Sequence, residues 1–340
     1  MVSNISPGAF ASCSSLTSVN LPIVTNIGIR AFANCSNLSS IDLPMASNIG
    51  YNAFYNCSNL TSVNLPMASY VEDNTFANCF RLTSISLPMA SYIAPSAFAS
   101  CSSLTSINLP MTSNIGHHAF YYCTSLSSID LPMASNIGSY TFCYCSNLTS
   151  VNIPIVTNIG SNAFYYCTSL SSIDLPMVSN IGYNAFYNCS RLSQLYLHNS
   201  SVCILDGINT FASTPYLFGN SSYFSGTPYI YVPASLVSAY QNATNWVHFS
   251  SYFSAIENSP AWSNISFTIN GTIYQVEKDM TWGEWVNSEY NTNGFYASGK
   301  SIYGPNDKLI CGPIGDDNAG ELVQSGYPII NQGVYIDNLS

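Results

Sequence analysis

A 22-residue period runs through more than half of this chain. Phenylalanine recurs with it from Phe10 to Phe186, and cysteine recurs from Cys13 to Cys189. Leucine from Leu16 to Leu192 and proline from Pro22 to Pro176 follow the same period. A period of about 20 to 50 residues is typical of a solenoid, a propeller or an array. Each repeat is too short to bury its own apolar face, so its Phe, Cys and Leu side chains must stack on their counterparts in the next repeat.

Each repeat reads A-F-x-x-C-x-x-L-x-x-[VI]-x-L-P-x-x-x-x-I-G. This pattern resembles the BspA-type leucine-rich repeat, which has an Ala-Phe pair, a Cys, a Leu-x-x-Ile-x-Leu-Pro strand and an Ile-Gly step in the same order. The resemblance covers residues 1 to about 197. It implies that the strands form one parallel sheet on the concave side of a curved solenoid.

The sequence therefore predicts an α/β-type repeat solenoid with one parallel β-sheet and a largely irregular convex side, plus a small C-terminal α+β module. We expect nine leucine-rich repeats over residues 1–197. Residues 198–257 should form an irregular segment and a C-terminal cap, with a last strand over 229–232 and a short helix after Pro233. A small hairpin-helix, β-rich module should occupy residues 258–340.

The C-terminal module contains alternating segments at 265–269 and 272–276 around Asn270-Gly271, which predicts a β-hairpin. A short helix is expected over 282–290. This stretch is similar to small terminal modules of gut-bacterial and phage proteins, a resemblance that implies no activity. Trp282 and Trp285 are expected to fill a small core rather than to form a sugar-binding platform.

Low charge narrows the possible partners. Charged residues make up 6% of the chain, with 6 basic against 16 acidic residues and a net charge of −10. So few cations cannot neutralise a run of phosphates, and we expect no nucleic-acid partner. No stretch reaches about 18 consecutive apolar residues, so no membrane insertion is expected. Residues 1–7 have neither a basic nor an apolar signal region, and we expect no signal peptide in this chain.

The cysteines and histidines do not form a predicted metal or cofactor site. Equivalent cysteines should lie one above another as a column of buried thiols. Cys143 and Cys145 are separated by one residue, which is not the spacing of a Cys-x-x-Cys site. His117 and His118 are neighbours whose side chains should point apart, with no third ligand nearby. We predict no metal, no cofactor and no catalytic residue.

Two sets of polar positions are candidate binding residues. Alternate strand side chains point outward, and this gives the first set: Asn20, Asp42, Asn64, Asn108, Asp130, Asn152 and Asp174. The second set follows the Ile-Gly step, where the repeats vary most: Tyr51, Asp73, His117, His118, Tyr140 and Tyr183. Tyr, Ser and Asn also dominate antibody binding loops. The alternative is that these positions are solvated turns without a ligand.

We expect a non-enzymatic binding or adhesion protein that presents a Ser/Asn/Tyr-rich face to a protein or a glycan. BspA-type proteins are surface and adhesion molecules, so the resemblance implies a bacterial surface; a phage virion component is the other expected setting. A structural spacer or cement protein is one alternative, and a polysaccharide-acting enzyme is another. No Gly-x-Ser-x-Gly, phosphate-binding loop or His-Glu-x-x-His motif supports the enzyme. The first repeat has no capping segment, and we expect a second copy or another partner to dock there.

Overall fold

The computed structural model describes residues 3–218, 229–259, 266–269, 272–275, 302–303, 309–311 and 335–336. The chain divides into two compact units, Met1–Ser254 and Ala255–Ser340. The finer limits at 197, 257 and 258 remain predictions.

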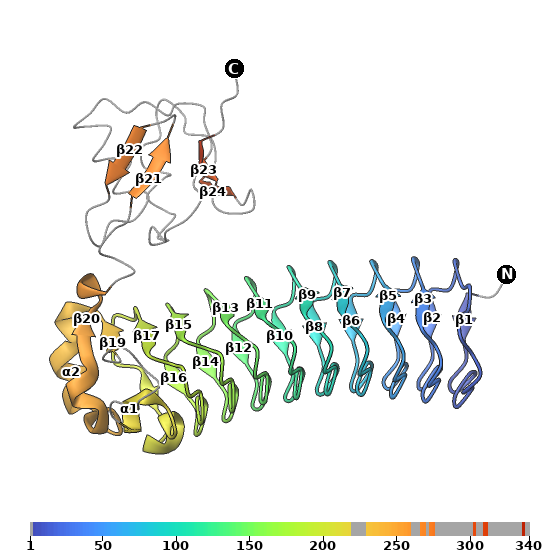
Figure 1. The fold of residues 1–340 in the computed structure, drawn as a ribbon. Helices are drawn as coiled ribbons and strands as arrows, with labels where there is room; N and C mark the ends of the chain where they lie inside the picture. Colours follow the sequence, from blue (N-terminus) through green and yellow to red (C-terminus); the bar gives the residue numbers. More distant parts are fainter. Residues whose placement is uncertain are drawn as a thin grey trace. The chain divides into compact units, whose positions relative to one another are not determined.

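The first unit is a stack of similar coils, one for each sequence repeat, and we call each coil a rung (Figure 1). Each rung contributes two short strands that pair in parallel with their equivalents one rung away. Paired residues occupy the same position of successive repeats, as in Asn26 with Asn48 and Ser40 with Ser62. The predicted parallel leucine-rich repeat solenoid is therefore confirmed.

The first row of strands comes from the predicted Leu-x-x-[VI]-x-Leu segments. Their middle residue points inward and the flanking Ser and Asn or Asp point outward, as the alternation of a strand requires. The strands are β3 (Ser40–Asp42), β5 (Ser62–Asn64), β7 (Ser84–Ser86), β9 (Ser106–Asn108), β11 (Ser128–Asp130), β13 (Ser150–Asn152), β15 (Ser172–Leu175) and β17 (Gln194–Leu197).

A second row of two-residue strands, which we did not predict, covers the pair that is Asn-Ile before a glycine in six of the rungs. It includes a seven-stranded parallel sheet from β6 to β18 and a three-stranded sheet of β1, β2 and β4. Its members are β1 (Asn4–Ile5), β2 (Asn26–Ile27), β4 (Asn48–Ile49), β6 (Tyr70–Val71), β8 (Tyr92–Ile93), β10 (Asn114–Ile115), β12 (Asn136–Ile137), β14 (Asn158–Ile159), β16 (Asn180–Ile181) and β18 (Ile204–Leu205).

The core between the two rows consists of columns of identical side chains. Phenylalanine rings from Phe10 to Phe186 stack with centroids 5.0 to 5.5 Å apart and nearly parallel planes. The cysteines from Cys35 to Cys189 are fully buried, and the Cys57 thiol donates a hydrogen bond to the Phe32 carbonyl at 3.0 Å. The column of buried thiols was predicted; its hydrogen bonds explain why the position holds a donor rather than an aliphatic side chain.

The stack of rungs continues beyond the last predicted repeat. Strand β18 pairs with β16, and the Phe211 ring stacks on Phe186 with centroids 5.6 Å apart. Phe211 belongs to η1 (Ile208–Phe211), which is followed by α1 (Pro215–Phe218). Residues 203–212 thus form a further rung, which sequence analysis missed because its spacing departs from the period of the others.

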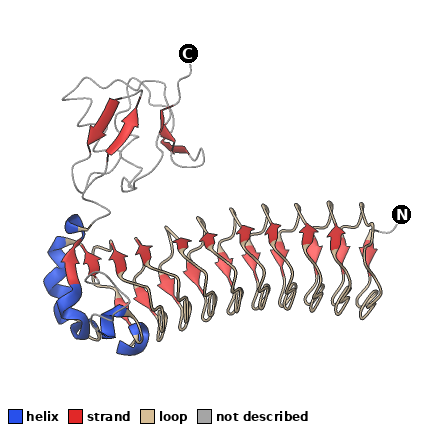
Figure 2. Cartoon of the chain, in the orientation of Figure 1, coloured by secondary structure: helices blue, strands red, loops and turns tan. Residues whose placement is uncertain are grey.

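A cap closes this end of the stack, with the expected strand and helix. Strand β19 (Tyr229–Val232) extends the β15–β17 sheet, and β20 (Phe253–Ala255) follows it. Figure 2 shows the helices gathered here. They are η2 (Ala234–Leu236), α2 (Val237–Asn242) and η3 (Trp246–Tyr252). The short helix η4 (Ile256–Asn258) belongs to the second unit. Trp246 is fully buried, and its indole N–H donates to the Cys203 carbonyl.

In the second unit, β21 (Ser266–Ile269) and β22 (Thr272–Gln275) form the predicted antiparallel hairpin. Strand β23 (Ile302–Tyr303) pairs with β24 (Leu309–Cys311) and with β25 (Tyr335–Ile336). The expected helix over 282–290, with Trp282 and Trp285, lies outside the described residues.

Candidate functional site

The outward candidates of the first strand row are exposed, except for the half-buried Asp174, and most of them interact with a side chain of a neighbouring rung. Asn64 donates to the Asp42 carboxylate at 2.8 Å, and Asn152 donates to Asp130 at 2.7 Å. Asn108 donates to the hydroxyl of Ser86, and the imidazole of His198 lies 2.7 Å from the carboxylate of Asp174. The alternation of Asn and Asp between repeats therefore has a structural cause, since an amide of one rung needs an acceptor in the previous one. Asn20 pairs with Asp42 through an isolated backbone bridge.

The second set of candidates occupies a different segment of each rung, the connection between the second strand row and the next first-row strand. Contacts between neighbouring rungs join residues of this segment, as in the stacked rings of His118 and Tyr140 and the hydrogen bond from the Asn162 N–H to the Tyr183 carbonyl. Tyr51, Asp73, His117, Tyr140 and Tyr183 are exposed or partly exposed, and His118 is half-buried.

This connection has a strict backbone requirement that the sequence analysis did not recognise. The second residue after each Ile-Gly step, or after its equivalents Val71-Glu72 and Ile93-Ala94, has a left-handed backbone with φ between 53° and 59°. These residues are Arg30, Asn52, Asn74, Ser96, His118, Tyr140, Asn162 and Asn184. Asparagine tolerates this conformation well and bulky residues do not. The variable positions are free of core packing, but they are not free of backbone constraint.

The two adjacent histidines have separate partners. The Nδ1 atom of His117 accepts a hydrogen bond from the Ser139 N–H at 3.1 Å. The His118 ring stacks on Tyr140, with centroids 4.7 Å apart and planes 5° apart. Burial, followed by the nearby His117, lowers the pKa of His118. No group of three or more His, Cys, Asp or Glu side chains that could hold a metal ion occurs within the described residues.

A second left-handed position lies four residues further along each rung. Its φ is between 56° and 63°, and its residues are Ser12, Asn34, Asn56, Asn78, Ser100, Tyr122, Tyr144, Tyr166 and Asn188. Six of these rungs use Ser or Asn, whereas three successive rungs use tyrosine. The sequence shows these tyrosines two residues after the repeat phenylalanine. Only the structure shows that their backbone conformation is unfavourable for a tyrosine.

These tyrosines belong to one continuous cluster of rings. Tyr122 and Tyr144 stack with centroids 4.4 Å apart, and Tyr144 lies 4.9 Å from Tyr166. Tyr165 stacks on Tyr187 at 4.9 Å. Edge-on contacts of Tyr121 join the cluster to the stacked pair of His118 and Tyr140. We call this set the aromatic edge: His118, Tyr121, Tyr122, Tyr140, Tyr144, Tyr165, Tyr166 and Tyr187.

The aromatic edge lies in a part of the chain that is almost without charge. Between Arg81 and Arg191 the sequence has no lysine or arginine, and its only carboxylates are Asp130 and Asp174. Both carboxylates belong to the first strand row, on the other segment of the rung. A partner at the aromatic edge would therefore meet rings and hydroxyls rather than ions.

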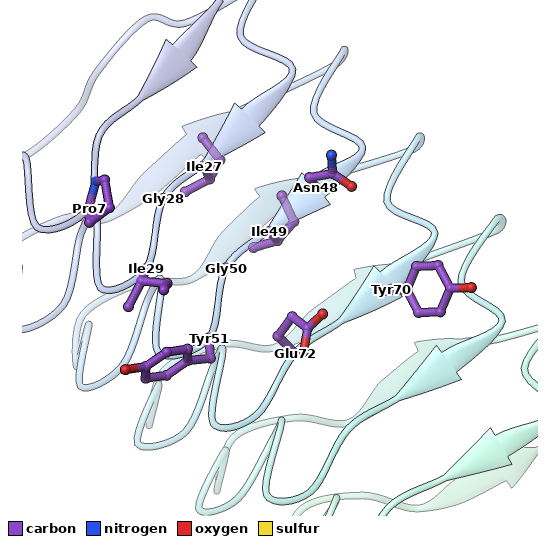
Figure 3. A pocket seen from close by; sticks show the side chains of 10 residues that line it. All are labelled: Pro7, Ile27, Gly28, Ile29, Asn48, Ile49, Gly50, Tyr51, Tyr70 and Glu72. Atoms are coloured by element: carbon purple, nitrogen blue, oxygen red, sulfur yellow. The ribbon is translucent and has the colours of Figure 1, made fainter.

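A hollow of about 540 Å³ lies on the first rungs (Figure 3). Residues from four successive rungs line it, among them Pro7, Ile29, Tyr51 and Tyr70, with Glu72 as its only charged residue. This is within the size range of small-molecule sites. Of the predicted candidates, only Tyr51 lies in it.

The buried thiols are not suited to nucleophilic chemistry. Burial raises the pKa of Cys57 and of Cys143 to about 12, and it raises the pKa of Cys101 well above its ordinary value. A reactive cysteine needs a thiolate and therefore a lowered pKa. Of the eleven cysteines within residues 3–218, only Cys13 is exposed.

No helix within the described residues has the length and apolar character that crossing a bilayer requires.

Parallel rungs with fixed core columns and variable exposed positions define a leucine-rich repeat scaffold.

The family follows from the sequence of the rungs. The family model described as a BspA type leucine rich repeat region matches residues 3–114 and 113–217, in six copies. These matches span more than half of the chain, and the chain belongs to the BspA-type leucine-rich repeat family. Among curated proteins, the comparison finds no match.

Solved leucine-rich repeat proteins are similar to this chain. One from Bacteroides ovatus is 25% identical, with a TM-score of 0.43 over 75% of this chain and 76% of that one. One from T. pallidum is 27% identical, with a TM-score of 0.39 over 50% and 72% of the two chains. A leucine rich cell surface protein from Faecalibacterium prausnitzii is 23% identical, with a TM-score of 0.36 over 62% and 80%.

Proposed function

We propose that this chain is a non-enzymatic binding scaffold, displayed on a bacterial or virion surface, that binds a protein or a glycan through its aromatic edge. The observation that carries this proposal is the row of three tyrosines in left-handed backbone, Tyr122, Tyr144 and Tyr166. Left-handed backbone at a non-glycine residue costs about 1–3 kcal/mol and is found where function maintains it. Serine or asparagine holds the equivalent position in the remaining repeats, so the fold does not need tyrosine there.

The chemistry of the aromatic edge fits an uncharged partner. Tyrosine offers a large rigid ring with a hydroxyl, and it loses little side-chain entropy on binding. The rings support one another across successive rungs, so the surface is formed before a partner arrives. Sugar rings and uncharged protein surfaces both match rings and hydroxyls without ions.

The first strand row is a weaker candidate for the same role. Its Asn and Asp residues are exposed, but several of their polar atoms already bond to the neighbouring rung. A ligand would have to replace those bonds. We place the outward column, including Asn20, Asp42, Asn64, Asn108 and Asp130, at the periphery of the binding surface.

The first rung supports a separate docking proposal. Phe10, Leu16 and Val19 occupy core positions, yet they remain partly exposed, whereas Phe32, Leu38 and Ile41 in the next rung are buried. Uncovered core positions of a solenoid favour contact with a further polypeptide. We propose that a second copy or another protein packs against them.

The test is a binding screen with a triple variant. Tyr122→Asn, Tyr144→Asn and Tyr166→Asn together remove three rings but introduce a residue that other rungs already use in this backbone. The labelled chain is applied to a printed array of neutral and acidic glycans and to immobilised extracellular proteins. We expect the wild type to bind neutral glycans or a protein, and the triple variant to lose that binding.

A matched control is Tyr70→Asn with Tyr92→Asn, which removes two rings away from the aromatic edge and introduces the residue that most other rungs have at this position. This control should bind like the wild type. Absence of any saturable binding by the wild type would contradict the proposal and favour a spacer or cement role. Equal binding by wild type and triple variant would exclude the aromatic edge.

A further inference from the structure

One large apolar side chain stands exposed at the same position of eight successive rungs. It directly follows the repeat proline, in the connection between the two strand rows. The exposed fractions lie between 36% and 55%. We call this set the methionine ridge: Ile23, Met45, Met67, Met89, Met111, Met133, Ile155 and Met177.

The core does not explain the methionine ridge. The leucine two residues before Met45, Leu43, and the following Ala46 are both fully buried, while Met45 itself is 52% exposed. An exposed turn position is normally polar, and the other exposed positions of these rungs are mostly Ser and Asn. A monomeric protein rarely exposes a continuous apolar patch larger than a few hundred Å², and larger patches mark contact surfaces.

We propose that the methionine ridge of one chain packs lengthwise against the methionine ridge of a second copy. The ridges of two copies have the same spacing between side chains. Rungs follow one another at the spacing of parallel strands, about 4.8 Å, so the ridge repeats one side chain at that interval over eight rungs. A second copy of the chain has apolar side chains at the same spacing over the same length, so the two rows can contact each other along their whole length. Methionine is unbranched and adapts its shape, which suits contact between two such rows.

The exposed apolar area of the ridge is close to what one side of a stable dimer buries. A stable dimer buries about 800 Å² on each partner. Eight large apolar side chains in one line, each about half exposed, approach that area together with the prolines beside them. A two-fold axis requires the same patch on both chains, and a ridge facing itself meets that condition.

The symmetry of the ridge gives an antiparallel pair. A two-fold axis that crosses the ridge at its midpoint places every ridge position of one chain opposite a ridge position of the other chain. With the two-fold axis between Met89 and Met111, each of these two residues faces the other across the pair. Each of the eight ridge positions of one chain then faces a ridge position of the other chain.

The experiment is the mass of the full chain in solution, measured by light scattering at tens of micromolar. The expected wild-type mass is twice the monomer mass of 36.8 kDa. Met89→Asp with Met111→Asp places like charges opposite each other and should give the monomer mass. The matched control, Ser84→Asp with Ser106→Asp, adds the same charges to exposed strand positions of the same two rungs and should stay dimeric. A monomeric wild type, or a dimeric Met double variant, would overturn the proposal.

A charge-pairing experiment tests the orientation and guards against a misfolded variant. The single variant Met89→Asp is mixed with the single variant Met111→Lys. In the antiparallel pair the new aspartate faces the new lysine, so we expect the heterodimer to exceed the statistical half of all dimers. A statistical mixture would overturn the antiparallel arrangement. This surface is separate from the aromatic edge, so the two proposals stand or fail independently.

Discussion

At the scale of single residues, two left-handed positions in each rung decide what the exposed connection can carry. The variable residues after the Ile-Gly step, including His118 and Tyr140, stand out in the sequence because the frame around them is constant. Their backbone angles could not be predicted, since nothing in the repeat pattern distinguishes a left-handed residue from an ordinary turn residue. At the second left-handed position six repeats have Ser or Asn, which are typical of turns. The three tyrosines at the same position do not fit that pattern, so the backbone conformation could not be predicted from it.

Tyr144→Asn should change the free energy of unfolding by no more than about 1 kcal/mol, because two effects oppose each other. Asparagine relieves left-handed strain of roughly 1–2 kcal/mol, while the lost ring contacts cost about 0.5–1.5 kcal/mol. Tyr144→Val loses the same contacts and places a β-branched residue in this backbone, so it should destabilise by about 1–3 kcal/mol. Urea unfolding of the three proteins measures both effects. Equal stability of the Asn and Val variants would contradict the left-handed assignment.

The Cys143 thiol should make stability depend on alkaline pH. Burial raises its folded pKa to about 12, above the ordinary value of about 8.5. Burial of the neutral thiol therefore contributes fully below pH about 8.5, and that contribution is lost as the pH rises toward 12. Cys143→Ala, which matches Ala99 in another rung, should reduce the loss of stability by up to about 1.4 kcal/mol per pH unit above pH about 9. Urea unfolding from pH 7.5 to about 10.5 checks this, and an unchanged slope would contradict it.

At the scale of the elements, the columns of the core could be predicted from the sequence, and the second strand row could not. Phe, Cys and Leu share one constant interval, so their stacking followed from the period alone. The first strand row alternates over three residues or more, as in β3, and could be recognised. The second row consists of two-residue strands such as β4, which are too short to show alternation.

Phe98→Ala should be strongly destabilising because Phe98 lies in the middle of the ring column. The ring is fully buried and stacks on Phe76 and Phe120 with centroids 5.3 and 5.5 Å apart. Removing it should cost about 3–5 kcal/mol. Phe10→Ala is the matched control, since Phe10 is half-buried and has one ring neighbour, Phe32. Thermal and urea unfolding should show a clearly smaller loss for Phe10→Ala, and equal losses would contradict the stacking account.

At the scale of the whole molecule, the sequence predicted a solenoid with a cap and a separate C-terminal hairpin, but not its principal surfaces. Tyr122, Tyr144 and Tyr166 belong to three successive repeats, so the aromatic edge exists only once the rungs stack. The methionine ridge had a regular sequence signal, but a methionine after a proline reads as a core residue until its exposure is known. The further rung that contains Phe211 lost the regular spacing and so escaped the repeat count.

The central claim is that a fixed core presents the aromatic edge as a binding surface. The most direct test is the Kd of the strongest partner from the array, measured by titration calorimetry for the wild type and the Tyr122→Asn/Tyr144→Asn/Tyr166→Asn variant. We predict at least about ten-fold weaker binding for the variant, equal to about 1.4 kcal/mol, with an unfolding free energy close to that of the wild type. An unchanged Kd in a fully folded variant would contradict the account.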